Sequence, residues 1–239
     1  MQIKTLIRLR FATLLLAVLG VTGAVATDSQ SAGNGRPIFR SPFAGPPTLS
    51  TWYLSQPYGN TVGAFRQRDR TYSEGQGIHF GIDLAARCGT PVLAIGDGTV
   101  YSIDGPFGSA PHNLVVSHAN GLWSLYGHLR QRTTHLFVGQ PVKQGDVVGF
   151  SGDWIDSVRC NRSPHLHLEI RTDRMRVAVN PIPLIDAPWQ DASLGVGFSS
   201  PTFEIDLESP RRWQSLFDQP DIRFGSPLIN DYAEAWPPD

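Results

Sequence analysis

The stretch RSPHLHLEIR, residues 162–171, alternates polar and apolar side chains over the length of a β-strand. Successive side chains of a strand point to opposite faces, so the apolar set is predicted to face a core: Leu166, Leu168 and Ile170. The polar set then shares the other face: His165, His167, Glu169 and Arg171. A histidine pair on a strand is also a common surface feature, so this stretch alone leaves its role open.

The first 26 residues, MQIKTLIRLRFATLLLAVLGVTGAVA, have the form of a secretory signal peptide. Basic residues precede an apolar run that is shorter than the roughly 20 residues of a spanning helix. Small residues, Ala24-Val25-Ala26, close it, and cleavage is expected after Ala26. We therefore expect an exported protein, periplasmic or secreted, with no stable membrane insertion after cleavage.

Charge argues against nucleic acid as a partner. The whole chain has 20 Lys+Arg and 21 Asp+Glu, and three of the basic residues lie in the signal segment, so the mature chain has 17 against 21 and a net charge of −4. Binding to nucleic acid depends on clustered basic residues that neutralise phosphates.

Two cysteines, Cys88 and Cys160, remain in the mature chain. An even count in an oxidising compartment predicts that they form a disulfide. The alternative is that one of them ligates a metal, but neither lies in a close Cys-x-x-Cys pair of the kind that zinc sites favour.

Turn signals divide the chain into four parts. After the signal peptide, residues 27–50 are rich in Gly, Ser and Pro and read as a linker. Residues 51–187 hold short apolar segments between turns, which predicts an all-β domain with little helix. Residues 188–239 form a C-terminal extension with prolines, acidic residues and scattered aromatics, and no motif gives it a role.

Two further segments carry chemistry. The segment IHFGIDLA offers His79 and Asp83, and imidazole and carboxylate are ligands that zinc accepts. A straight strand would hold these residues roughly 13 Å apart, so the chain must bend, and Gly81 tolerates a bend. The segment LYGHLR adds His128 at the end of a predicted strand. Each signal is weak when it is taken singly.

Taken together, the order of the segments HFGID, GTPVLAIGDGTV, NLVVSHANGLWSLYGHL, GQPVKQGDVVGFSG and SPHLHLEI resembles the lysostaphin-like (LytM-domain) zinc metallopeptidases. The resemblance covers about residues 51–187. It implies a compact antiparallel β-sheet or sandwich of the duplicated-hybrid-motif type, and one zinc ion per chain. The substrate class that the resemblance implies is the peptide cross-links of bacterial peptidoglycan.

Carried over residue by residue, the resemblance makes His79, Asp83 and His167 the metal ligands, with His128 and His165 as catalytic residues. Two histidines and one aspartate leave a net charge of +1 and a fourth position for water, as in catalytic zinc sites. A neutral histidine can take the proton of that water and return it to the leaving amine. Which of His128 and His165 is the general base stays open, as does the role of Glu169 beside them.

The chain departs from the family between SG and PHLH, where SGDWIDSVRCNRSPHLH replaces a short turn. The bond that is cleaved therefore cannot be carried over. Two other functions stay open. One is a non-catalytic LytM-type regulator of another wall hydrolase, although such modules typically lack part of the metal set, which is complete here. The other is a zinc peptidase that acts on exported proteins.

Overall fold

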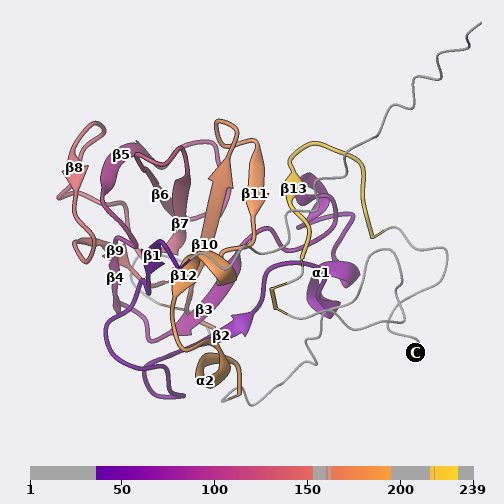
Figure 1. The fold of residues 1–239 in the computed structure, drawn as a ribbon, viewed down its shortest axis with the longest axis horizontal. Helices are drawn as coiled ribbons and strands as arrows, with labels where there is room; N and C mark the ends of the chain where they lie inside the picture. The colour runs from indigo at the N-terminus through magenta and orange to yellow at the C-terminus, as the bar shows by residue number, and fades with distance from the viewer. Residues whose placement is uncertain (1–35, 153–159, 161–162, 195–215, 218, 231–239) are drawn as a thin grey trace, which may run out of the picture. The chain divides into compact units, whose positions relative to one another are not determined.

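The computed structural model of the chain describes residues 36–152, 160, 163–194, 216–217 and 219–230 (Figure 1). The predicted signal peptide and most of the inserted segment before His165 lie outside the described residues. None of the helices in the described part has the length and apolar character needed to span a membrane.

The largest sheet of the described residues has nine strands and is antiparallel at every pairing. Its strands are β2 (Trp52–Gln56), β3 (Ile82–Ala86), β5 (Gly98–Ile103), β6 (His112–Ser117), β7 (Trp123–Leu129), β8 (Pro141–Val142), β10 (His165–Thr172), β11 (Val177–Val179) and β13 (Ile222–Arg223). The order along the sheet is β13-β11-β10-β7-β6-β5-β8, while β3 pairs with β10 and β2 pairs with β3.

Two small sheets and four short helices complete the described structure. Strands β4 (Pro91–Leu93) and β9 (Val147–Phe150) pair antiparallel, and β1 (Phe39–Arg40) pairs parallel with β12 (Ile185–Asp186). The helices are α1 (Val62–Arg66), α2 (Trp189–Leu194) and the 3-10 turns η1 (Ser73–Gly75) and η2 (Ile182–Leu184). The prediction of an all-β domain with little helix is confirmed.

Strand β10 is buried on both faces. Leu166, Leu168 and Ile170 enter the main core, as the alternation predicts. On the opposite face, His167, Glu169 and Arg171 are also buried. Because β10 pairs with β7, β3 and β11, it lies in the middle of the sheet (Figure 1), and other parts of the chain cover its polar face.

Residues 36–50, which composition predicts as linker, are integrated into the fold where they are described. Strand β1 pairs with β12, and Phe39 and Phe43 belong to the main core. Phe39 and Phe43 supply apolar contacts to the core, which the Gly- and Pro-rich composition of this segment does not indicate.

Cys88 and Cys160 are joined by a disulfide, in agreement with the prediction from their number and the expected compartment. The Cα atoms lie 5.8 Å apart, within the usual range for a disulfide. The bond ties the turn that follows β3 to the segment that precedes β10.

Candidate metal and catalytic site

The register of β10 brings the sequence-predicted residues together. His167 lies opposite Asp83 of β3 on one side and opposite Gly127 of β7 on the other. His128 follows Gly127 directly, and His165 begins β10. The central strand thus gathers motifs that are up to 88 positions apart, as the His79–His167 pair shows.

Three ligand-type atoms form a tight triangle. His79 Nε2 lies 3.2 Å from His167 Nδ1, and Asp83 Oδ1 lies 3.4 Å from the first and 2.8 Å from the second. Two nitrogen ligands at about 2.05 Å from a tetrahedral zinc ion are about 3.3 Å apart. The donor set and its spacing therefore fit a zinc ion.

Each histidine of the triangle is oriented through its other ring nitrogen. His79 Nδ1–H donates to the Pro57 carbonyl at 2.7 Å, which turns Nε2 toward the triangle. His167 Nε2–H donates to Glu169 Oε1 at 3.2 Å, which turns Nδ1 toward Asp83. Outer hydrogen bonds of this kind fix the tautomer of metal-binding histidines.

Gly81 is required for a second reason besides the predicted bend. Its φ is not left-handed, but a Cβ at this position would lie 2.7 Å from His167 Cε1 and 2.8 Å from the Leu168 carbonyl oxygen. Glycine is therefore required because the His167 ring passes over this backbone. The chain also bends at Gly81, directly before β3, as the sequence predicts, and His79 ahead of the bend pairs with Gly59 in an isolated bridge.

The triangle shifts the pKa values of its members. Burial acts to raise the pKa of Asp83, but the charges of His79 and His165 and hydrogen bonds from His167 and His79 hold it well below its usual value. Burial acts to lower the pKa of His167, but Asp83 and Glu169 together raise it to about 9. A cation is therefore favoured at this position of the fold.

His128 and His165 form a second pair beside the triangle. Their ring centroids are 4.8 Å apart, and the His128 ring lies 5.7 Å from that of His167. His165 Nε2 is 3.9 Å from Asp83 Oδ1. His128 Nδ1–H donates to the Ala110 carbonyl, and His165 Nδ1–H donates to the Ser163 carbonyl at 2.8 Å. In the neutral state both rings therefore keep Nε2 as an acceptor.

His128 has an unusual backbone conformation and a lowered pKa. Its φ of 54° is left-handed, which is uncommon outside glycine. Burial, together with the charges of His167 and His165, lowers its pKa to about 4. A histidine that stays neutral near pH 7 is able to accept a proton.

Glu169 and Arg171 form a buried ion pair behind His167. The sequence left the role of Glu169 open. Glu169 has no exposed surface, and its Oε2 accepts from Arg171 Nε at 2.6 Å. Arg171 in turn donates to the Phe107 carbonyl at 3.0 Å. The spacing His-x-Glu-x-Arg on one strand face was the available signal.

Tyr72, which lies ahead of the first motif, packs its ring edge-on to His79 with centroids 5.6 Å apart. Its hydroxyl bonds to Gln56, with 3.2 Å between Tyr72 Oη and Gln56 Nε2. Burial and the charge of Asp83 raise its pKa well above the usual value. This tyrosine therefore packs against the ligand and stays protonated.

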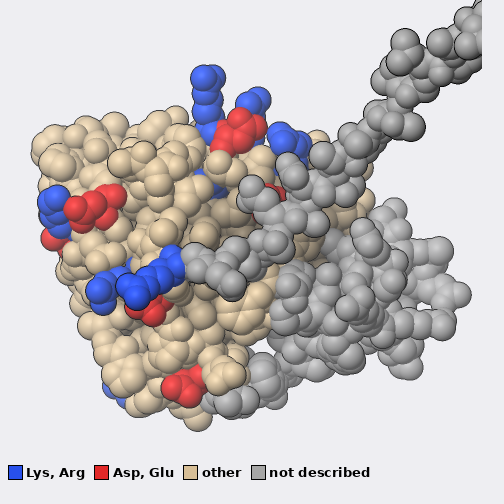
Figure 2. Space-filling view, viewed as in Figure 1, with Lys and Arg blue, Asp and Glu red and all other residues tan. Residues whose placement is uncertain are grey.

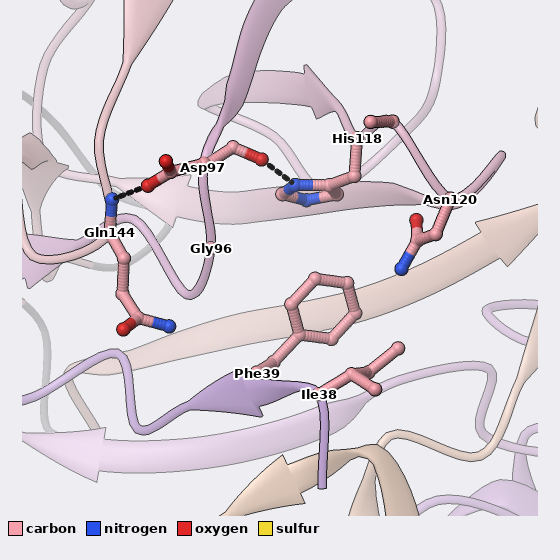
Figure 3. A pocket seen from close by; sticks show the side chains of 8 residues that line it. Ile38, Phe39, Gly96, Asp97, His118, Asn120 and Gln144 are labelled. Atoms are coloured by element: carbon pink, nitrogen blue, oxygen red, sulfur yellow. Dashed lines mark hydrogen bonds between the residues drawn. The ribbon is translucent and has the colours of Figure 1, made fainter.

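A hollow of about 430 Å³ lies elsewhere on the described surface (Figure 3). Its walls come from strand β1 and three turns: Ile38, Phe39, Gly96, Asp97, His118, Ala119, Asn120 and Gln144. His118 Nδ1 bonds to the Asp97 carbonyl at 2.8 Å, and the Asp97 carboxylate accepts from the Gln144 backbone N–H at 2.9 Å. No residue of the triangle lines this hollow, and His118 is held by the Asp97 carbonyl and the Ser124 hydroxyl.

Charged side chains are mixed on the visible face of the molecule (Figure 2). Basic and acidic groups lie close together in small sets, and the ion pairs of the described residues include Lys143 with Asp97 and Arg176 with Asp173. The candidate site consists of histidines and carboxylates in or next to β3, β7 and β10 and does not depend on a patch of surface charge.

Comparison with known proteins identifies the domain. Residues 77–181 match peptidase family M23. The DD-carboxypeptidase/endopeptidase Mpg of Neisseria meningitidis serogroup B is 38% identical over 105 residues, which are 44% of this chain and 22% of that protein. Lysostaphin of Staphylococcus staphylolyticus is 29% identical over 114 residues, which are 46% of this chain and 22% of that protein.

A solved structure is similar to part of the chain as well. The catalytic domain of the prophage-encoded M23 protein EnpA from Enterococcus faecalis is 28% identical, with a TM-score of 0.42, and the match covers 58% of this chain and 95% of that one. The aligned region spans about a fifth of the two curated relatives. The family match over residues 77–181 identifies this part of the chain as a domain of peptidase family M23.

Proposed function

We propose that this chain is an exported zinc metalloendopeptidase that hydrolyses peptide cross-links of bacterial peptidoglycan. The observation that carries the proposal is the triangle of His79, Asp83 and His167, with ligand atoms 2.8–3.4 Å apart and two further histidines beside it. The substrate class comes from the family and from the names of the relatives, an endopeptidase and lysostaphin.

His79, Asp83 and His167 would hold the metal through Nε2, Oδ1 and Nδ1. When bound, zinc supplies Lewis acidity that activates water and polarises the scissile carbonyl. The Pro57 carbonyl and the Glu169 carboxylate keep the two imidazoles turned toward the ion. The chain thus contributes three ligands and leaves room for a reacting group.

His128 and His165 would transfer the proton from the attacking water to the leaving amine. Each has Nδ1–H bonded to a backbone carbonyl, so Nε2 can take a proton from the attacking water. The same Nε2–H then returns the proton to the leaving amine, which completes hydrolysis of the amide with no net change on the protein. Because its Nδ1–H is bonded to a backbone carbonyl, the second histidine would have to be protonated to donate from Nε2–H to the developing oxyanion.

Digestion of purified peptidoglycan tests the proposal. The zinc-loaded mature protein is incubated with wall preparations that differ in their cross-links, and fragments are identified by mass spectrometry. We expect cleavage of a peptide bond in at least one wall type, and cleavage about 10² to 10⁴ times slower by a zinc-loaded His165→Ala variant. Cleavage of an unfolded exported protein but of no wall type would favour a general peptidase. No cleavage of either substrate would favour a regulator.

A further inference from the structure

A segment beyond the family match packs against the loop that supplies His79. We call residues 216–217 and 219–230 the C-terminal strap. It lies outside residues 77–181, and its strand β13 pairs with β11 at the edge of the main sheet (Figure 1, yellow). Ile222 of the strap has no exposed surface and belongs to the main core. The strap is thus part of the folded domain.

The loop in question, residues 57–79, connects β2 to β3 and is called here the His79 loop. It contains α1 and η1, and its two ends meet where Gly59 and His79 exchange backbone hydrogen bonds of 2.8 and 2.9 Å. Asp83 and His167 lie in paired strands of the sheet, whereas His79 precedes β3. The position of His79 therefore depends on what holds the loop.

One end of the strap binds the side of the His79 loop that follows β2. Gln219 Oε1 accepts from the Asn60 backbone N–H at 3.1 Å. The Gln219 side chain also fills the space beside Gly59, where a Cβ would lie 2.0 Å from Oε1. Tyr58 donates its hydroxyl to the Pro220 carbonyl at 2.9 Å. Residues directly before and after Gly59 are therefore held by the strap.

The other end of the strap binds the side of the His79 loop that leads to β3. Asn230, which has no exposed surface, donates from Nδ2 to the Gly77 carbonyl at 2.5 Å and to Asn60 Oδ1 at 3.2 Å. One buried amide thus bridges the two sides of the loop just inside the Gly59–His79 pair. Backbone bonds add to it, since Ile229 N–H donates to the Gln76 carbonyl at 3.0 Å.

Between these two ends, the strap reaches the back of the metal triangle. The Phe224 ring packs on Phe80, with centroids 5.3 Å apart, and Phe80 packs on His167 at 5.5 Å. The Arg171 guanidinium lies over the Phe224 ring, 4.1 Å from its centroid. Phe224 therefore covers the ion pair that orients His167.

We propose that the C-terminal strap is a positioning element of the metal centre, which fixes the His79 ligand relative to Asp83 and His167. The inference rests on the proposed metal site, but its structural half, the holding of the His79 loop, can be measured without metal. Asn230 and Gln219 act through the loop and touch neither the ion nor the substrate.

The test compares two substitutions within the strap of the full chain. Asn230→Ala removes the buried bridge, whereas Arg223→Ala, the control, removes an exposed side chain that pairs only with Asp173 among the described residues. Hydrogen exchange of the metal-free proteins should show faster exchange of the His79 and Gly59 amides in Asn230→Ala, with the amides of β10 unchanged. The control should match the wild type at all of these amides.

Metal binding is the second readout. We expect zinc affinity, measured by competition with a chelator, to fall about tenfold or more in Asn230→Ala. The visible absorption of the cobalt(II) form should also change, because loss of an imidazole ligand alters the coordination. Gln219→Ala, which loosens the opposite side of the loop, should behave in the same way and serves where Asn230→Ala does not fold.

The outcomes separate the two proposals. Unchanged amide exchange together with wild-type zinc affinity in both variants would overturn the positioning role. If the wild type itself bound no zinc, the proposed function would fail, and exchange at the His79 and Gly59 amides would still decide whether the strap holds the loop.

Discussion

Glu169 Oε1 lies 3.2 Å from His167 Nε2, on a carboxylate that has no exposed surface and that is paired through Oε2 with Arg171. A carboxylate can only accept, so this contact holds a proton on Nε2, and Nδ1, which donates to Asp83 in the metal-free protein, is the nitrogen that a metal would take in place of its proton. The ligand atom of His167 is therefore selected by a residue two positions along the same strand.

Glu169→Gln should lower zinc affinity by about 10- to 100-fold, as is typical when an outer partner of a metal ligand is removed. The amide cannot accept from both His167 and Arg171, and Arg171 then loses its buried counter-charge. Zinc competition with a chelator measures the effect, with circular dichroism to verify the fold. Asp173→Asn, which breaks exposed ion pairs to Arg176 and Arg223, is the matched control and should leave affinity unchanged.

The disulfide should stabilise the domain substantially. Cys88 and Cys160 are 72 positions apart, and closing a span of this length stabilises by about 4 kcal/mol in the chain-entropy model. Cys88→Ala/Cys160→Ala should therefore unfold at a clearly lower temperature than the oxidised wild type, and reductant should lower the Tm of the wild type alone. Detection of two free thiols in the denatured, unreduced protein would refute the pairing.

His118 should make stability depend on pH. Burial lowers its pKa below the usual 6.5, so the unfolded chain takes up a proton at a higher pH than the folded one. The contribution is complete above about pH 6.5 and is lost as the pH falls through the lowered pKa. The loss of Tm on acidification should be smaller in metal-free His118→Asn than in the wild type. An equal loss in both, with His135→Asn as the exposed control, would exclude this role.

The sequence was a good guide wherever a segment carries its own pattern. Alternation in segments such as 165–171 predicts strands that the sheet contains, because one face of each must be apolar to enter the core. Burial of Glu169 could not be predicted this way, since its cover comes from elsewhere, including Phe224 of the C-terminal strap.

The sequence also gave no indication of burial or of glycine requirements that depend on contacts with residues far along the chain. Phe39 and Ile222 are buried in short strands within stretches that lack periodicity, so composition alone indicates linker or extension. The need for glycine at 81 follows from the His167 ring 86 positions later in the chain. The local sequence therefore suggested a bend there and gave no sign of this contact.

The last prediction separates metal binding from chemistry on strand β10. His167 lies within the triangle, 2.8 Å from Asp83, whereas His165 lies 3.9 Å from the same oxygen and beside His128. We therefore expect His167→Ala and His79→Ala to lose bound zinc. His165→Ala and His128→Ala should stay folded and keep zinc, but they should hydrolyse peptidoglycan about 10² to 10⁴ times more slowly, the usual contribution of a general acid or base.

Zinc content and hydrolysis rate must be measured on the same preparations, so that loss of activity can be assigned to loss of metal or to loss of proton transfer. His112→Ala is the control, because its ring pairs with Asp104 and it should keep both zinc and activity. Near wild-type hydrolysis by zinc-loaded His165→Ala and His128→Ala would refute their catalytic roles. Full zinc content in His79→Ala after dialysis against a chelator would refute the ligand assignment, because two remaining protein ligands hold the ion poorly.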